Sequence, residues 1–379
     1  MEKYENSSLE TNFTGKDVCC ERSIMPPVLD PDMLILTADD VLKTYPEYEA
    51  ESARKYFEYL KLKEENPTFG YKRLAKMLGV SISRTRCWKQ WDGKPTSVTA
   101  IEKLTAVGLL PLHADNAKLP GILRLLAAGF TDGGIDKRLN TFHFNSARME
   151  NILAWKKDFI DIFPFGEKTL SAIITGEKET SIGVRTTDRA IVRFFAALGC
   201  PVGNKTNVSY KLPEFLFSIL EEHKAAFLDG FFSCEAGMPP SSFSISLSKI
   251  EEKEMEHLTF LNKFCKLCES VGIKYTSINL VPQKEMLNGK PRRKDGKTCD
   301  SYRILFSFKP ENVIRAHKLI PLTYAAEKKE RFDRAVKKYH QRYLPAPIKS
   351  LNSSIDIDAN NSLQESATEE SSQAESLVL

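Results

Sequence analysis

The stretch from Ala225 to Gly237, AAFLDGFFSCEAG, is an apolar helical run that ends in one acidic residue beside glycine. A partial copy stands at Leu125 to Gly134, LLAAGFTDGG. The acid of the first copy is Asp132, and that of the second is Glu235, 103 positions later. The two runs are predicted to form helices that pack against each other, with both acids at one end of the pair.

Small residues at matching positions predict where these two helices touch. Five positions before the acid stands Ala127 or Gly230, and one position before it stands Thr131 or Cys234. Residues four apart lie on one face of a helix, and a stripe of small residues lets two helix backbones approach closely. The alternative is a pair of buried helices whose acids only cap a helix or form ion pairs.

This pair of motifs resembles the LAGLIDADG homing endonucleases (dodecapeptide, or DOD-type), in the single-chain form that carries two motif copies. The resemblance covers roughly residues 118–339 and includes FFAALGCPVGNK at Phe194 to Lys205, which is similar to archaeal members. It implies an α+β fold of two αββαββα halves, in a monomer with internal pseudo-two-fold symmetry. Ser233 stands where the motif commonly has Asp, and Ala236 where its first Gly usually follows the acid.

The order of predicted elements repeats, as expected for two related halves. Alternating residues predict the first strand of each half, and longer amphipathic runs predict the helices. The predicted first half has a strand at 137–146, a helix at 149–163, a hairpin at 170–187 and a helix at 188–198. The predicted second half has strands at 241–249, 273–281 and 301–309, helices at 253–271 and from 311, and a C-terminal helix at 321–342.

Upstream of the motifs, Gly70 to Trp91 reads GYKRLAKMLGVSISRTRCWKQW. Gly79 suits a tight turn, and Ser81 can cap the helix that follows, so the stretch predicts a helix-turn-helix. It resembles the homeodomain-like helix-turn-helix of regulators and recombinases. Thr85 and Trp88, three apart, are predicted to face the core. The DNA-binding residues expected on the exposed face are Ser83, Arg84, Arg86 and Lys89. The alternative is an ordinary helical hairpin with a basic, solvated face.

Charge is unevenly distributed along the 379 residues, whose net charge is +4. Residues 1–30 carry three bases and six acids, and residues 351–379 carry six acids and no base. The part between them therefore has a net charge of +13, which favours a polyanionic partner such as double-stranded DNA.

No apolar run reaches the ~18 residues of a membrane helix, and the N-terminus lacks the apolar stretch of a signal peptide. We therefore expect a soluble, cytoplasmic protein without a membrane partner. Cys265 and Cys268 have the CxxC spacing of zinc sites, but they stand in an amphipathic helical pattern without a second pair. They are predicted to be buried thiols.

These patterns divide the chain into five parts: a disordered tail at 1–35, a small all-α helix-turn-helix domain at 36–112, the first half at 118–220, the second half at 221–345, and a disordered acidic tail at 346–379.

The chemistry implied by the resemblance is metal-dependent hydrolysis of a phosphodiester. Asp132 and Glu235 are the expected metal ligands and catalytic acids, and their oxygen atoms favour Mg²⁺. Basic residues on the predicted strands are further catalytic candidates: Arg185, Lys249, Arg303 and Lys309. A basic loop between two strands of the second half is expected to contact phosphates through Lys290, Arg292, Arg293, Lys294 and Lys297.

The function predicted from this reasoning is a site-specific, double-stranded DNA endonuclease of the homing type. It is expected to be freestanding rather than an intein, because the chain has no Cys or Ser at its start and no His-Asn pair at its end. The main alternative is a transcriptional regulator built on a catalytically inactive copy of the same fold. An RNA-splicing maturase is a third possibility, which the helix-turn-helix disfavours.

Overall fold

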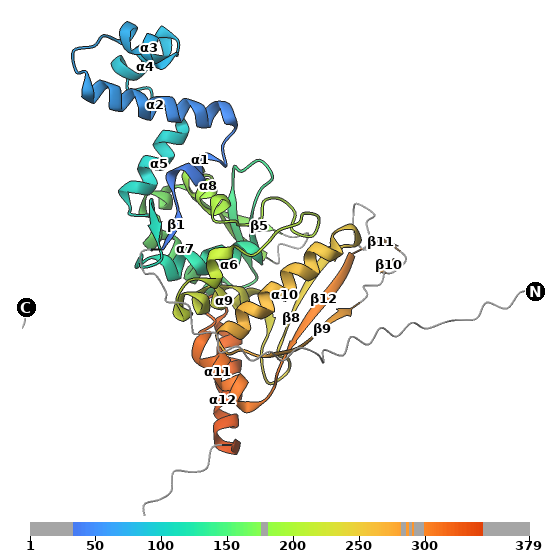
Figure 1. Cartoon of the computed structure of the whole chain (residues 1–379). Helices are drawn as coiled ribbons and strands as arrows, with labels where there is room; N and C mark the ends of the chain where they lie inside the picture. The colour runs from blue at the N-terminus through green and yellow to red at the C-terminus, as the bar shows by residue number, and fades with distance from the viewer. Residues whose placement is uncertain (1–32, 176–180, 282–285, 288–289, 292–298, 344–379) are drawn as a thin grey trace, which may run out of the picture.

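The computed structural model describes residues 33–175, 181–281, 286–287, 290–291 and 299–343. Within these residues the fold is α+β, with antiparallel sheets packed against helices (Figure 1). None of the described helices combines the length and the apolar character that crossing a membrane requires.

The N-terminal part is helical and is closed by one short pair of strands. Its elements are β1 (Leu34–Leu36), α1 (Ala38–Leu42), α2 (Glu47–Glu65), α3 (Tyr71–Leu78), α4 (Ile82–Gln90), α5 (Thr96–Ala106) and β2 (Leu112–His113). Strand β1 pairs with β2, and Leu36 is buried. Residues 34 and 35 are therefore ordered in a strand, which corrects the predicted end of the disordered tail.

The turn between α3 and α4 has the local geometry predicted from the sequence. Gly79 ends α3 with a φ of 65°, in the left-handed region that glycine adopts without steric cost. The Ser81 hydroxyl accepts a hydrogen bond from the Arg84 backbone N–H at 3.2 Å and so caps α4. Thr85 and Trp88 are buried, as predicted. Trp88 packs against two tyrosine rings of α2, each 5.4 Å away between centroids.

The first four-stranded sheet follows α6, the helix of the first motif. The elements are α6 (Leu119–Phe130), β3 (Gly133–Ile135), β4 (Phe142–Ser146), α7 (Met149–Ile162), a 3₁₀ turn (Pro164–Thr169), β5 (Leu170–Thr175), β6 (Ser181–Thr186) and α8 (Arg189–Ala197). The strand order is β3-β4-β6-β5. The predicted strand at 137–146 is confirmed only for its second part, and the short edge strand β3 was not predicted.

The second four-stranded sheet follows α9, the helix of the second motif. The elements are a 3₁₀ turn (Glu214–Phe217), α9 (Glu221–Glu235), β7 (Ala236–Gly237), β8 (Ser244–Ile250), a 3₁₀ turn (Glu251–Lys253), α10 (Glu254–Ser270), β9 (Tyr275–Val281), β10 (Met286–Leu287), β11 (Lys290–Pro291), β12 (Cys299–Phe306), α11 (Pro310–Leu319) and α12 (Ala326–Tyr343). The strand order is β7-β8-β12-β9, and α10 runs alongside the strands of this sheet in Figure 1.

Two predicted boundaries in the second half were wrong. The strand predicted at 301–309 ends at Phe306, and Lys309 instead precedes α11, because Pro310 occupies the first turn of that helix. The C-terminal helix begins at Ala326, not at 321.

The N-terminal part is anchored to the first half through α8. The Lys103 ammonium on α5 lies 2.7 Å from the Asp188 carboxylate, which caps α8. The Arg193 guanidinium donates to the Thr44 carbonyl oxygen and lies over the Tyr45 ring, 4.5 Å from its centroid. Arg193 is buried, and a buried charge is costly unless polar groups compensate it. The first half therefore depends on Thr44 and Tyr45 of the N-terminal part to stabilise the Arg193 guanidinium.

Candidate active site

Helices α6 and α9 approach closely where the sequence places small residues. A Cβ atom added to Gly230 would lie 2.5 Å from the Arg124 carbonyl oxygen and 2.9 Å from the Ala127 Cβ. No side chain fits at that distance, so glycine at this point allows backbone contact between the helices. The pair Ala127 and Gly230 is thereby brought together in the structure.

The second predicted pair, Thr131 and Cys234, lies one residue before the acids. The Thr131 hydroxyl donates to the Ala127 carbonyl oxygen at 3.1 Å. The pKa of the Cys234 thiol is raised to about 12, first by burial and then by the charge of Asp132, while a hydrogen bond with Thr131 opposes the rise. Residues from the ends of both helices therefore interact directly.

The two motif acids lie close enough to repel each other. The pKa of Glu235 is raised to about 7, first by burial and then by the charge of Asp132, while two lysines, Lys205 and Lys328, oppose the rise. Burial also raises the pKa of Asp132, against the same two lysines. A pair of neighbouring carboxylates whose pKa values are both raised is a typical feature of functional sites.

The lysines Lys205 and Lys328 are site residues that the sequence reasoning missed. The Lys205 ammonium donates to the Gly133 carbonyl oxygen at 2.6 Å, just after α6. The Lys328 ammonium donates to the carbonyl oxygens of Ser233 and Cys234 at 2.8 and 2.7 Å, at the end of α9. Each lysine thus donates hydrogen bonds to carbonyl oxygens at or just after the C-terminal end of one motif helix, where the helix dipole is negative.

Glu235 should make the stability of the chain depend on pH. Between pH 4.5, its ordinary pKa, and about 7, the folded chain holds a proton that the unfolded chain releases. The free energy of unfolding should therefore fall as pH rises through this window. The variant Glu235→Gln should lose that contribution, and at pH 8 without divalent metal it should be more stable than the wild type by on the order of 2 kcal/mol. Urea unfolding of both proteins at pH 5 and pH 8 measures this, and parallel pH profiles would contradict it.

Arg185 and Arg303 occupy matching places on the exposed faces of the two sheets. Arg185 on β6 pairs in register with His143 and Ser171, and its Nε lies 3.4 Å from the Ser171 hydroxyl. Arg303 on β12 donates from Nε to the Ser246 hydroxyl at 3.1 Å. Neither arginine is among the charges that shift the pKa of the two acids.

Lys249 and Lys309 lie in different surroundings from each other. Lys249 is buried at the end of β8, where its ammonium donates to the Lys205 carbonyl oxygen at 2.6 Å and lies over the Tyr210 ring. Burial lowers its pKa to about 8. Lys309 is exposed before α11, off the strand on which it was predicted.

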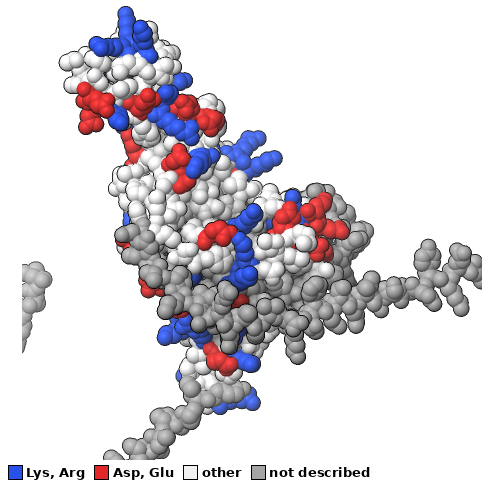
Figure 2. Space-filling view, in the orientation of Figure 1, with Lys and Arg blue, Asp and Glu red and all other residues white. Residues whose placement is uncertain are grey.

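The predicted DNA-binding residues of α4 are all exposed, namely Ser83, Arg84, Arg86 and Lys89. The Arg86 Nε donates to the Gln90 side chain at 2.7 Å, and the Lys89 ammonium donates to the Phe69 carbonyl oxygen at 2.9 Å. Figure 2 shows Lys and Arg side chains projecting from the end of the molecule that α3 and α4 form. In the predicted basic loop, Lys290 belongs to β11, and Arg292, Arg293, Lys294 and Lys297 lie outside the described residues.

A pocket of about 250 Å³ opens beside Asp132. Its walls include Arg148 from the start of α7, Lys328 and Arg331 from α12, and Cys234 from α9. Among the described residues, no cluster of three or more His, Cys, Asp or Glu side chains could hold a metal ion. Cys265 and Cys268 are buried free thiols, as predicted.

Comparison with known proteins finds partial similarities, and no family model matches the chain. The tRNA-splicing ligase RtcB of Methanocaldococcus jannaschii is 28% identical over 184 residues, which cover 43% of this chain and 19% of the ligase. The archaeal Lon protease of Pyrococcus abyssi is 30% identical over 132 residues, which cover 34% of this chain and 12% of the protease. The chain thus spans a fifth or less of these relatives, so the activities in their names are not transferred to it.

Solved structures of the homing endonuclease I-DmoI are similar to about half of the chain. Its mesophilic variants match with a TM-score of 0.36 and 15% identity, over 54% of this chain and 97% of theirs. I-DmoI in complex with DNA and Ca matches with a TM-score of 0.35 and 15% identity, over 53% of this chain and 90% of that one. These TM-scores are low, so the similarity does not identify the function of this chain.

Proposed function

We propose that this chain is a site-specific, metal-dependent endonuclease of double-stranded DNA, of the LAGLIDADG homing type. The observation that carries the proposal is the proximity of two carboxylates, those of exposed Asp132 and half-buried Glu235, at the ends of two closely packed helices. The similar strand orders of the two sheets support two pseudo-symmetric halves around this point.

The acid pair fits a divalent metal of the Mg²⁺ type. Mg²⁺ keeps several waters and binds through one or two carboxylates together with phosphate oxygens of a substrate. Asp132 and Glu235 supply the two carboxylates that this mode of binding uses. Their mutual repulsion, visible in the raised pKa of Glu235, would be relieved by a bound cation.

When bound, such a metal would lower the pKa of a water and offset charge on the phosphate oxygens. The residues of the chain then have distinct tasks. Asp132 and Glu235 would hold the metal. The ammonium groups of Lys205 and Lys328 supply positive charge beside them, where a phosphate accumulates negative charge. Lys249 supports Lys205 through its hydrogen bond to the Lys205 carbonyl oxygen and is a positioning residue.

The DNA would lie along the exposed faces of the two sheets, where Arg185 and Arg303 are centrally placed. Serine hydroxyls and a histidine beside these arginines can hydrogen-bond bases or phosphates. The exposed face of α4 would read a further segment of duplex as a recognition helix.

The alternative is a DNA-binding regulator that keeps the fold without cleavage. One observation favours it: Lys205 and Lys328 lower the pKa of both acids and so partly compensate their charge without metal. Ser233 also has a structural task, since its hydroxyl accepts from the Tyr324 N–H at 3.2 Å.

A selection on random duplex DNA tests the proposal. The chain is incubated with the library and Mg²⁺, and both bound and cleaved molecules are sequenced. A nuclease should yield ends at one fixed position inside the enriched sequence. Enriched sequences that stay intact at every Mg²⁺ concentration would support the regulator instead.

The variant Arg84→Gln/Arg86→Gln should mainly change sequence preference. If these arginines read guanines, discrimination at the contacted positions should fall by about 1–3 kcal/mol for each lost contact. Point variants are preferable to removal of residues 1–112, because removal would leave Arg193 and Asp188 without their partners. A repeat of the DNA selection measures the change. The control Lys61→Gln, an exposed lysine on α2, should select the wild-type sequence. If the Arg84→Gln/Arg86→Gln variant also selected the wild-type DNA sequence, α4 would not read bases.

A further inference from the structure

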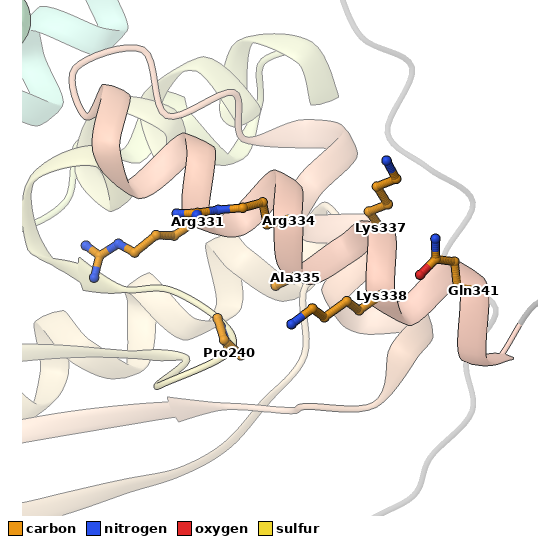
Figure 3. A pocket seen from close by; sticks show the side chains of 7 residues that line it. All are labelled: Pro240, Arg331, Arg334, Ala335, Lys337, Lys338 and Gln341. Atoms are coloured by element: carbon orange, nitrogen blue, oxygen red, sulfur yellow. The ribbon is translucent and has the colours of Figure 1, made fainter.

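A stripe of basic side chains follows one face of α12. Arg331, Arg334, Lys338 and Arg342 are spaced by three, four and four positions, so they lie on one side of the helix. Together with Pro240 they line two neighbouring pockets of about 440 and 190 Å³, here called the α12 groove. Figure 3 shows Arg331 and Lys338 reaching toward the side where Pro240 lies.

Among the described residues, the acids of α12, which are Glu327, Glu330 and Asp333, form no ion pair with Arg331, Arg334 or Lys338 of the α12 groove. Glu327 pairs with Arg148 at 2.8 Å, and Asp333 pairs with Lys329 at 2.6 Å and with His317 at 2.7 Å. Within the part of the chain that the structure describes, Arg331, Arg334 and Lys338 have no ion pair with a carboxylate. Exposed, uncompensated charges of one sign attract a polyanion.

The α12 groove is continuous with the candidate active site. Arg331 lines both the groove and the pocket that contains Asp132. From Arg331 to Arg342 the helix rises by about 16 Å, the axial length of roughly five base pairs of DNA. In Figure 1, α12 lies on the opposite side of the α6–α9 pair from α3 and α4. A duplex segment beside α12 would therefore lie beyond the reach of α4.

We propose that the α12 groove binds the phosphate backbone of duplex DNA on the side of the acid pair that faces away from α3 and α4. The proposal rests on the proposed function, because the duplex is the substrate assumed there. Backbone contacts of this kind position a duplex without reading its sequence. A different occupant would be residues 351–379 of this chain, which carry six acids and no base.

The test compares three full-length proteins: the wild type, Arg334→Gln/Lys338→Gln, and the control Lys61→Gln/Lys266→Gln. The control removes the same charge from exposed positions on α2 and α10. Arg331 is left intact because it lines the pocket beside Asp132. Affinity for a random-sequence duplex is measured without divalent metal between 50 and 300 mM salt, so that cleavage does not enter the result.

The groove variant should bind about tenfold more weakly at ~0.1 M salt, and the slope of log affinity against log salt should flatten by about 2, since two phosphate contacts are lost. The control should match the wild type. A groove variant with wild-type affinity and slope would overturn the proposal while leaving the proposed function intact. If the groove variant bound duplex DNA more tightly than the wild type, the proposal would also be overturned, and the groove would be assigned to residues 351–379 as its occupant. A wild type without DNA affinity would overturn both proposals.

Discussion

Replacing Asp132 with Asn, or Glu235 with Gln, should abolish Mg²⁺-dependent cleavage of the selected duplex. A metal held by these acids is expected to supply several kcal/mol of transition-state stabilisation, so the single-turnover rate should fall about a thousandfold or more. Affinity for DNA without metal should persist and become slightly tighter, because a negative charge near the phosphates is lost.

The variant Glu222→Gln is the matched control, since it removes a largely exposed carboxylate from the first turn of the same helix, α9. It should cleave at the wild-type rate. The regulator alternative makes a different prediction: the wild type cleaves no duplex, including the one it binds most tightly. Cleavage that survives in both Asp132→Asn and Glu235→Gln would place the chemistry elsewhere in the molecule.

Gly230→Ala should strongly destabilise the folded chain. The new Cβ would lie 2.5 Å from the Arg124 carbonyl oxygen, a backbone atom. Arg124 is held in place because its guanidinium makes two hydrogen bonds to the Asp158 carboxylate, at 2.7 and 2.8 Å. The helices must therefore separate, and the free energy of unfolding should fall by roughly 3 kcal/mol, despite the better helix propensity of alanine.

Gly70→Ala provides the matched substitution for this measurement. Gly70 has a φ of −72°, and an added Cβ would meet nothing within 4 Å. Gly70→Ala should change the free energy of unfolding, measured with denaturant, by only about a few tenths of a kcal/mol. If Gly230→Ala unfolds at the same denaturant concentration as Gly70→Ala, the close contact between α6 and α9 is absent. A Gly230→Ala chain that fails to fold agrees with the expectation.

The sequence was most informative where a local rule determines the structure. Small residues four apart predicted a close helix contact, and Gly79 and Ser81 predicted the turn and cap between α3 and α4. These features depend on backbone geometry within a few residues, so they can be read without the fold.

The lysines of the site could not be found in that way. Lys205 follows a glycine-containing turn, and Lys328 stands beside Lys329 in a helix rich in charged residues. Their proximity to the acids arises only when distant segments pack, and nothing local distinguishes them. Lys249 was predicted on a strand, but its burial depends on Tyr210 and Lys205, which belong to a different segment. The short strands β3 and β7 have too few residues to show alternation.

The central claim is that α6 and α9 bring Asp132 and Glu235 together to form one metal site. Titration with Mn²⁺ at pH 8, followed by the electron paramagnetic resonance signal of the free ion, tests this claim on the wild type, Asp132→Asn and Glu222→Gln. Each protein is measured with the selected duplex bound. Wild type and Glu222→Gln should bind Mn²⁺ alike, and Asp132→Asn should bind it at least about tenfold more weakly, because a carboxylate ligand is lost. Equal Mn²⁺ affinity of the wild type and Asp132→Asn would contradict the claim.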